Sequence, residues 1–305
     1  MNEREHYQEV QAATQLRFNE LWQGNFTANE AAARRNPGVL ALRGKFKGVT
    51  AIVVGAGPSL DKNLRFLNRA RDHAVIVASD AALKPLVSQG VEPTFVVCLD
   101  PQEEITKFFT GVRHRGMTLV VPSIVHPRVL DLWEGNVVFY NKHAPDIPVL
   151  VEIGRRVPHL GVLTPGGTVL SVGYDLAFQS GANPIIFVGQ DLSYSEKNVY
   201  TRDSAGGEQS LESTLERQRE NIVYGRDING RNLPTLKSML VSKQWFDWAF
   251  TTWERDNPPD VINCSEAGIL TDHCRWMSLS EALFRYCRKK INPSWTLQKA
   301  LKSKR

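Results

Sequence analysis

The stretch Thr50–Asn68, TAIVVGAGPSLDKNLRFLN, decides the fold of this 305-residue chain. An apolar, β-branched run ends at Val54 and an apolar spacing of three and four residues resumes at Leu60, which predicts a strand, a tight loop and a helix. The loop exposes backbone N–H groups at its glycines and places Ser59 to cap the helix, whose N-terminus attracts anions such as phosphate. It lacks the GK[ST] of a Walker motif and the third glycine of the dinucleotide fingerprint, so it predicts either a different phosphate-binding loop or a plain turn.

Composition is that of an ordinary globular protein, with 42% hydrophobic and 23% charged residues. No apolar run approaches the roughly 18 residues that cross a bilayer, and the N-terminus MNEREHYQEV is too charged for a secretory signal. We therefore expect no membrane span and a cytoplasmic location. The four cysteines form no CxxC pair, which argues against disulfides and a zinc site. The net charge of +5 is concentrated near the C-terminus, so nucleic acid is not the expected partner.

Short β-rich runs alternate with helical patterns from Lys45 onward. This alternation predicts an α/β, Rossmann-like fold with a mostly parallel sheet and helices on both of its faces. The predicted strands are Thr50–Val54, Ala74–Ala78, Thr94–Leu99, Thr118–Val121, Asn136–Tyr140 and Pro184–Val188.

We divide the chain into an N-terminal helical segment (1–44), a nucleotide-binding core (45–191), an extension of the same domain (192–290) and a basic tail (291–305). The first segment should pack beside the core or contact a second subunit. The extension predicts a polar loop over the strand ends at 192–216, a hairpin at 221–234, an aromatic-rich helix at 236–253 and a strand at 261–264. The basic tail is expected to be solvated or disordered.

Ligands of open parallel sheets bind beyond the carboxyl ends of the strands, so the candidate site residues are taken from there. They are Gly55, Gly57, Pro58, Ser59, Asp80, Asp100, Asn141, His143 and Asp191. Asp80 and Asp100 are either N-caps of following helices or contacts to a ribose, a sugar or a magnesium ion. A second glycine-rich junction, Thr164–Thr168, has Thr164 as an expected cap and Pro165 as first helical residue, and its glycines offer further N–H groups to an anion.

Four strings resemble the MptE-like domain of bacterial motility accessory factor (Maf) proteins, over roughly Lys45 to Leu283. They are VVGAGPSL, VASDAALKPLVSQGVEPTFVVCLDPQEE, TPGGTVLSVGYDLAFQSGANPIIFVGQDLSYS and INCSEAGI. The resemblance implies a Rossmann-like glycosyltransferase that moves a nonulosonic, sialic-acid-like sugar from a CMP-activated donor to a Ser or Thr of flagellin. It implies no required metal or other cofactor. The first and third strings are also similar to the donor loop and later motifs of bacterial sialyltransferases.

The resemblance also implies roles for single residues. Thr164, Gly166 and Gly167 would offer N–H groups to the phosphate, and Asp100 or Asn141 would contact ribose or base. The family's pattern leaves the general base open, and we expect it to be Asp191, with His143 and then His273 as alternatives. Tyr194 and Tyr200 would donate hydrogen bonds to the departing phosphate.

Two other hypotheses remain open. The archaeal branch of the same domain implies a 6-hydroxymethylpterin diphosphokinase, which moves pyrophosphate from ATP with magnesium held by Asp80 and Asp100. The related transferases carry a histidine shortly after the GQD-type motif, whereas residues 192–272 contain none. Because a general base must reach the acceptor hydroxyl, this departure leaves room for a non-catalytic protein that binds nucleotide sugars.

Overall fold

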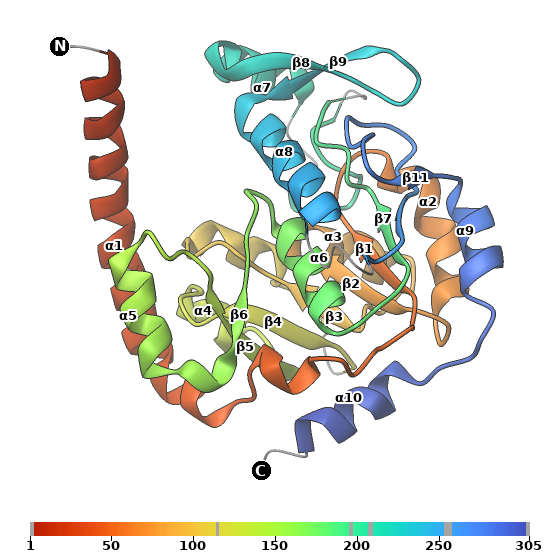
Figure 1. The fold of residues 1–305 in the computed structure, drawn as a ribbon, viewed down its shortest axis with the longest axis horizontal. Helices are drawn as coiled ribbons and strands as arrows, with labels where there is room; N and C mark the ends of the chain where they lie inside the picture. The colour runs from red at the N-terminus through yellow and green to blue at the C-terminus, as the bar shows by residue number, and fades with distance from the viewer. Residues whose placement is uncertain (1–2, 114–115, 195–197, 207–209, 253–257, 303–305) are drawn as a thin grey trace.

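One nine-stranded parallel sheet forms the centre of the molecule (Figure 1). The computed structural model describes residues 3–113, 116–194, 198–206, 210–252 and 258–302, with side chains from residue 18 onward. The strand order is β11-β10-β7-β1-β2-β3-β4-β5-β6. In that order the strands are Arg275–Trp276, Val261–Asn263, Ile185–Val188, Ala51–Val54, Val75–Ser79, Phe95–Val97, Thr118–Pro122, Asn136–Lys142 and Val162–Leu163. The predicted α/β, Rossmann-like fold is confirmed, and only the short strands β6 and β11 were not predicted.

Helices cover both faces of the sheet because successive side chains of each buried strand point to opposite sides. Val53 and Val77 lie in one core with helices α6 and α8, whereas Ile52 and Ile76 lie in another with α2 and α9. The helices of the sheet layers are α2 (Leu60–Leu67), α3 (Asp80–Ser88), α4 (Pro127–Asp131), α5 (Pro148–Arg156), α6 (Val169–Gln179), α8 (Lys237–Thr252) and α9 (Leu279–Tyr286).

The order of the strands reverses beside β1. From β1 the chain builds outward through β2, β3, β4 and β5 to β6, and then returns to place β7 on the other side of β1. Strands β10 and β11 continue in that second direction. Ligands of doubly wound sheets bind at such a switch point, where the loops after two neighbouring strands diverge.

The N-terminal segment forms helix α1 (Glu3–Arg35), which runs along the edge of the body beside α5 (Figure 1). Trp22, Phe26 and Ala33 are buried in the core that α1 shares with α4 and α5. Asn25 donates from Nδ2 to the carbonyls of Pro101 and Ile124, at 2.8 and 3.0 Å. The predicted helix beside the core is therefore confirmed, while contact with a second subunit stays a prediction.

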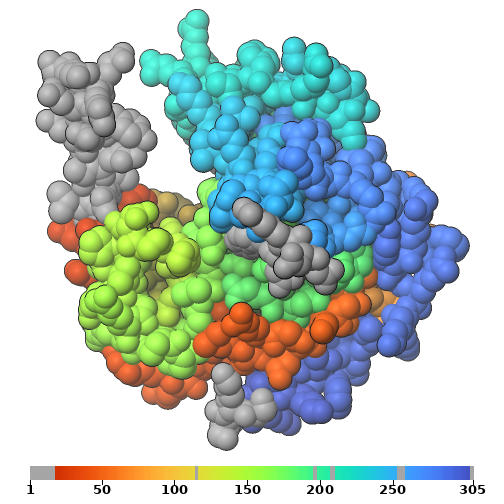
Figure 2. Space-filling view, in the orientation of Figure 1, coloured from red at the N-terminus to blue at the C-terminus, as the bar shows by residue number. Residues whose placement is uncertain are grey.

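The extension after β7 rises above the ends of the strands. It contains α7 (Leu211–Arg217) and the antiparallel hairpin of β8 (Ile222–Arg226) and β9 (Asn232–Leu236), followed directly by α8. Residues 211–252 stand as a cyan to light-blue block over the green of α6 in the space-filling view (Figure 2). The predicted hairpin and helix are confirmed, and position 253 of the predicted helix lies outside the described residues.

The basic tail is part of the fold, so the expectation of a solvated or disordered tail is wrong for its first twelve residues. Pro293–Lys302 forms helix α10, which packs on the 3₁₀ turn Val39–Leu42. Leu297 and Ala300 are only 4% and 3% exposed and belong to the core that contains Val53. Basic side chains of this segment occupy the solvent side of an amphipathic helix, which composition alone did not separate from disorder.

We expect Leu297→Ala to lower the free energy of unfolding by about 2–4 kcal/mol, because it empties a buried site. Trp295 lies on the same helix and is 59% exposed, so Trp295→Ala serves as the matched control and should change stability by less than about 1 kcal/mol. Urea denaturation measures both. Equal effects would mean that α10 does not stay docked.

Candidate functional site

A cavity of about 390 Å³ lies at the switch point, beyond the carboxyl ends of β1 and β7. Its walls are formed largely by residues 55–58, 79–81, 168–170, 189–194 and 199–200. Side chains of α7 and α8 complete the enclosure of the cavity. This volume falls within the range of small-molecule sites. The first predicted loop therefore does border a ligand-sized space.

The carboxylate of Asp191 occupies the N-terminus of α2. Ser59 donates from its backbone N–H to Asp191 Oδ2 at 3.0 Å, and the Ser59 hydroxyl donates to Oδ1. Ser59 holds the N-cap position of α2, as predicted, but its side chain makes no capping bond to that helix. A Cβ on Gly57 would lie 2.7 Å from the Asp191 carboxylate, so glycine is needed there for this close approach. The anion that the helix attracts is a side chain of the protein itself.

The N–H groups of both glycines of the first loop are also engaged within the protein. Gly55 donates to the Val188 carbonyl at 2.8 Å, and Gly57 donates to the Gly189 carbonyl at 3.0 Å. Gly55, Gly57 and Pro58 thus form a wall of the cavity rather than a cradle of free amides, which corrects the predicted role of this loop.

The second glycine-rich junction differs from its prediction in a similar way. Helix α6 begins at Val169, not at Pro165. The Thr164 N–H donates to Asp175 Oδ2 at 2.6 Å, and the Gly166 N–H donates to the Ser171 hydroxyl at 2.6 Å. These N–H groups are therefore engaged within the fold, and neither Thr164 nor Gly166 lines the switch-point cavity.

The N-terminus of α6 itself opens into the cavity. Thr168 holds the N-cap position with extended backbone but makes no capping bond, and Val169 and Leu170 line the wall beside it. The first turn of a helix has N–H groups without intrahelical partners, and its dipole favours a negative charge. This helix start at Val169, four residues beyond the predicted one at Pro165, is the better anion site.

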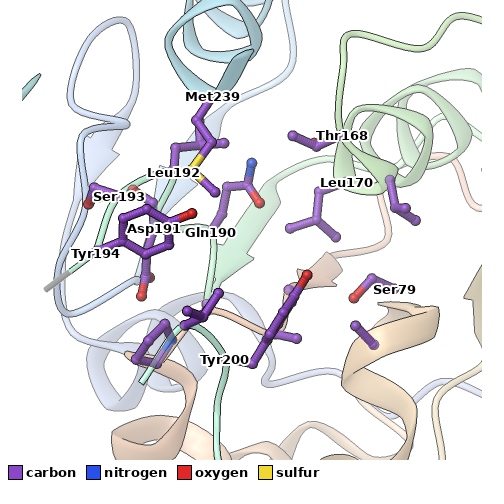
Figure 3. Close-up of a pocket in the computed structure, with 18 of the residues that line it drawn as sticks. Ser79, Thr168, Leu170, Gln190, Asp191, Leu192, Ser193, Tyr194, Tyr200 and Met239 are labelled. Atoms are coloured by element: carbon purple, nitrogen blue, oxygen red, sulfur yellow. Dashed lines mark hydrogen bonds between the residues drawn. The ribbon is translucent and has the colours of Figure 1, made fainter. Parts of the chain in front are cut away.

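Four buried polar atoms of the lining have no hydrogen-bond partner among the described residues: Ser79 Oγ, Thr168 Oγ1, Gln190 Nε2 and Thr214 Oγ1. Ser79 and Gln190 are each 5% exposed. Figure 3 shows the first three of these side chains converging on the same space from different elements. Buried polar groups are nearly always paired in folded proteins, so four unpaired ones around one cavity indicate a polar ligand.

Two carboxyl groups face the cavity from neighbouring strands, as predicted. Burial and the nearby charge of Asp100 raise the pKa of Asp80 to about 7, although the Ala81 N–H donates to Asp80 Oδ1 at 2.7 Å. Burial also raises the pKa of Asp100, against the opposing charge of Lys142. The N-cap of α3 is Ser79 and no helix begins at Pro101, so N-capping is excluded for both aspartates.

Two tyrosines and one arginine complete the polar lining. Burial raises the pKa of Tyr194 and of Tyr200, and the charges of Asp80 and Asp100 raise that of Tyr200 further. Both hydroxyls therefore remain protonated donors at neutral pH. Arg217, at the end of α7, is the only cationic residue in the cavity wall within the part of the chain that the structure describes.

The model of one protein family, 6-hydroxymethylpterin diphosphokinase MptE-like, matches residues 24–197, which is more than half of the chain. The chain belongs to the MptE-like family. The family match covers the sheet from β1 to β7 and both glycine-rich junctions, but ends before α7 and α8. The suspected MptE-like resemblance is thereby confirmed.

Individual relatives extend the comparison. One uncharacterized protein of Treponema pallidum (strain Nichols) is 32% identical over 91 residues, which cover 30% of this chain and 42% of that protein. Another uncharacterized protein of the same organism is 28% identical over 172 residues, which cover 53% of this chain and 29% of that protein. A Maf glycosyltransferase from Magnetospirillum magneticum AMB-1 has a similar structure, with a TM-score of 0.65 and 21% identity, covering 93% of this chain and 41% of that one. The chain thus spans less than half the length of each, and the structural likeness shows a shared fold.

Two predicted site residues of this MptE-like protein lie elsewhere. His143 is exposed and lines two other surface cavities, and Asn141 lines one of them. The Asn141 side chain accepts from the Ser123 hydroxyl at 3.2 Å and donates to the Val157 carbonyl at 3.0 Å. The structure therefore brings neither of them to the switch-point cavity, and His143 is not positioned to replace Asp191 there.

Some features of the site were missed from the sequence. Arg217 lies in a polar stretch without a motif, and nothing in its spacing places it over the strand ends. Ser79 and Gln190 each follow the end of a predicted strand. That position was the feature of the sequence that could have assigned both residues to the site. Within the described ranges, no group of three or more His, Cys, Asp or Glu side chains is placed to hold a metal. No described helix is long and apolar enough to cross a bilayer.

Asp191→Asn should lower the free energy of unfolding by about 1–3 kcal/mol, because it removes a buried, charge-assisted acceptor of the Ser59 bonds. Ser59→Ala should cost a similar amount, and the double variant less than the sum, since both changes break one pair. Denaturant unfolding of the four proteins measures the coupling. Additive losses would contradict the structural role of this pair.

The stability of the protein should also depend on pH through Asp80. Its pKa is about 7 in the folded protein and near 3.8 in the unfolded chain, so the folded state binds the extra proton and stability falls as pH rises between these values. We expect Asp80→Asn, which keeps the acceptor for the Ala81 N–H, to gain at most about 4 kcal/mol above pH 7 and nothing below pH 4. Melting temperatures from pH 4 to 8 test this, and parallel curves for both proteins would contradict it.

Proposed function

We propose that this protein is a glycosyltransferase that binds a nucleotide-activated acidic sugar in the switch-point cavity and transfers the sugar to a protein hydroxyl. The observation that carries the proposal is the open N-terminus of α6, which faces Arg217 and two protonated tyrosines across one cavity. The likeness to the fold of a Maf glycosyltransferase supports it.

The donor phosphate is assigned to the first turn of α6. The N–H groups of Val169 and Leu170, the Thr168 hydroxyl and the Arg217 guanidinium together present hydrogen-bond donors and positive charge to one anion. Asp80, which follows β2 beside the first loop, lies where carboxylates of related sheets bind ribose hydroxyls.

Transfer requires a leaving group that accepts negative charge. As the bond from the sugar to the phosphate breaks, charge grows on the phosphate oxygens, and preorganised donors in an enclosed site stabilise it. Tyr194 and Tyr200 remain protonated and line the same cavity, so they suit this role. The unpaired donors Gln190 Nε2 and Ser79 Oγ suit the carboxylate of an acidic sugar.

We propose a role for Asp191 that differs from the predicted one of general base. Asp191 lies in the cavity wall, but its two oxygens accept hydrogen bonds from Ser59, and we propose that it positions the loop rather than removes a proton. The acceptor is proposed to be a serine or threonine hydroxyl of a protein such as flagellin, on the basis of the Maf resemblance. No metal is required for this reaction, because amide, hydroxyl and guanidinium donors stabilise the phosphate.

A second candidate is pyrophosphate transfer from ATP to a hydroxymethylpterin. The pair Asp80 and Asp100, facing one cavity from neighbouring strands, favours it, because two carboxylates with substrate phosphates are a common magnesium site. The name of the family model points the same way.

A thermal-shift panel separates the two candidates, because a ligand that binds only the folded state raises its melting temperature. CMP and CMP-sialic acid should raise it with EDTA present. Arg217→Gln should weaken CMP binding about tenfold, since it removes one charge-assisted contact. The matched control is Arg219→Gln, an exposed arginine outside the cavity wall, which should bind CMP like the parent.

The same panel has an outcome that would contradict the glycosyltransferase proposal. A shift with ATP and magnesium, abolished by EDTA and absent with CMP, would reject the glycosyltransferase and favour the diphosphokinase. Equal CMP affinity in the Arg217 and Arg219 variants would remove the phosphate from the place assigned to it.

A further inference from the structure

A second compartment opens beside the switch-point cavity. It has a volume of about 250 Å³ and is lined by Leu99, Gly167, Ser238 and Ser242. Four residues belong to the walls of both spaces: Asp100, Thr168, Val169 and Met239. The two compartments therefore meet at the N-terminus of α6, where the proposed function places the donor phosphate.

Asp100 is the only residue with a titratable side chain among those four, and its carboxylate is not held by the protein. It accepts no hydrogen bond within the part of the chain that the structure describes, and the residue keeps exposed surface toward the cavity, although the protein packed around its carboxyl group raises its pKa. Asp191 is fixed by Ser59, and Asp80 is 3% exposed and bonded to the Ala81 N–H. Among the three carboxylates of the site, only Asp100 is accessible from the second compartment.

We propose that the second compartment admits the acceptor hydroxyl and that Asp100 removes its proton. This inference rests on the proposed function. A base in a transfer reaction must touch the acceptor while the donor is bound, and the wall shared by two compartments is where both substrates meet.

The step balances without an additional reactant. The acceptor O–H proton passes to the Asp100 carboxylate, and the acceptor oxygen forms a bond to the anomeric carbon of the sugar. The bond from that carbon to the phosphate oxygen breaks, and its electron pair leaves with the nucleoside monophosphate. Asp100 then returns the proton to solvent through the exposed side of the compartment.

The charges around Asp100 suit this role. Burial raises the pKa of Asp100 above its usual value, which strengthens it as a base, while the Lys142 ammonium opposes that shift and favours the ionised carboxylate. The other titratable groups around it are those of the same cavity wall, Asp80, Asp191, Tyr194, Tyr200 and Arg217, and the buried Cys98 and Tyr140, whose pKa values are raised by burial and also by the charge of Asp100. Transfer should therefore be lost as pH falls through the pKa of Asp100.

Asp100→Asn tests the assignment with CMP-sialic acid as donor and a synthetic peptide containing serine and threonine as acceptor. We expect kcat to fall by about 10²–10⁴, with the Kd for CMP unchanged within about threefold. The variant should also lose the acidic limb of the pH profile. A weaker Kd with unchanged kcat would show that Asp100 binds the nucleotide instead, and would overturn the inference.

The compartment has a separate test. Ser238→Trp should fill it and raise the KM for the peptide at least tenfold, while hydrolysis of the donor by water continues. Val241 lies on the same helix, is 60% exposed and lines neither compartment, so Val241→Trp is the matched control. Equal peptide kinetics in the two tryptophan variants would overturn the acceptor route. A parent protein that binds no CMP or CMP-sialic acid would instead overturn the proposed function on which the route rests.

Discussion

The bond between Asp191 and Ser59 joins the loop after β7 to the start of α2, and the cavity depends on that junction. The loops after β1 and β7 diverge at a switch point, and beyond Val54 and Val188 the backbone bond from the Gly57 N–H to the Gly189 carbonyl crosses the gap between them. The carboxylate bridges this gap, and Gly57 permits its approach. A buried charge is stable here because it accepts two hydrogen bonds and meets the positive end of a helix.

As a consequence, two helix N-termini with similar sequence patterns differ in the anion that each can bind. Both α2 and α6 follow glycine-rich junctions, and both are N-termini that attract anions. Asp191 satisfies the first, so that site is closed to a ligand phosphate. Asp175 and Ser171 engage the amides that precede α6 but leave its first turn open. The negative charge that the protein supplies at α2 thereby directs an incoming anion to α6.

The sequence predicted those features that depend on local pattern and missed those that depend on distant partners. Apolar β-branched runs were enough to predict the core strands, and the rule on strand ends was enough to bring Asp80, Asp100 and Asp191 to one cavity. The helix start predicted at Pro165 was wrong because Gly167 adopts a φ of 90°, which a right-handed helix cannot contain, so that α6 begins only at Val169. Arg217 was missed because its place depends on how the extension folds back over the sheet.

Hydrogen bonds to the residues beneath it hold the extension in place over the sheet. The Thr201 N–H donates to the Ala56 carbonyl at 2.9 Å, its hydroxyl donates to Asp61 in the first turn of α2, and the Ser204 hydroxyl donates to the Ala81 carbonyl at 3.1 Å. Tyr200 is therefore held by backbone groups that also shape the cavity wall. Because these carbonyls belong to the loop after β1 and to the first turn of α3, a shift of either one moves the tyrosine with it, and the donors opposite α6 keep their relative positions.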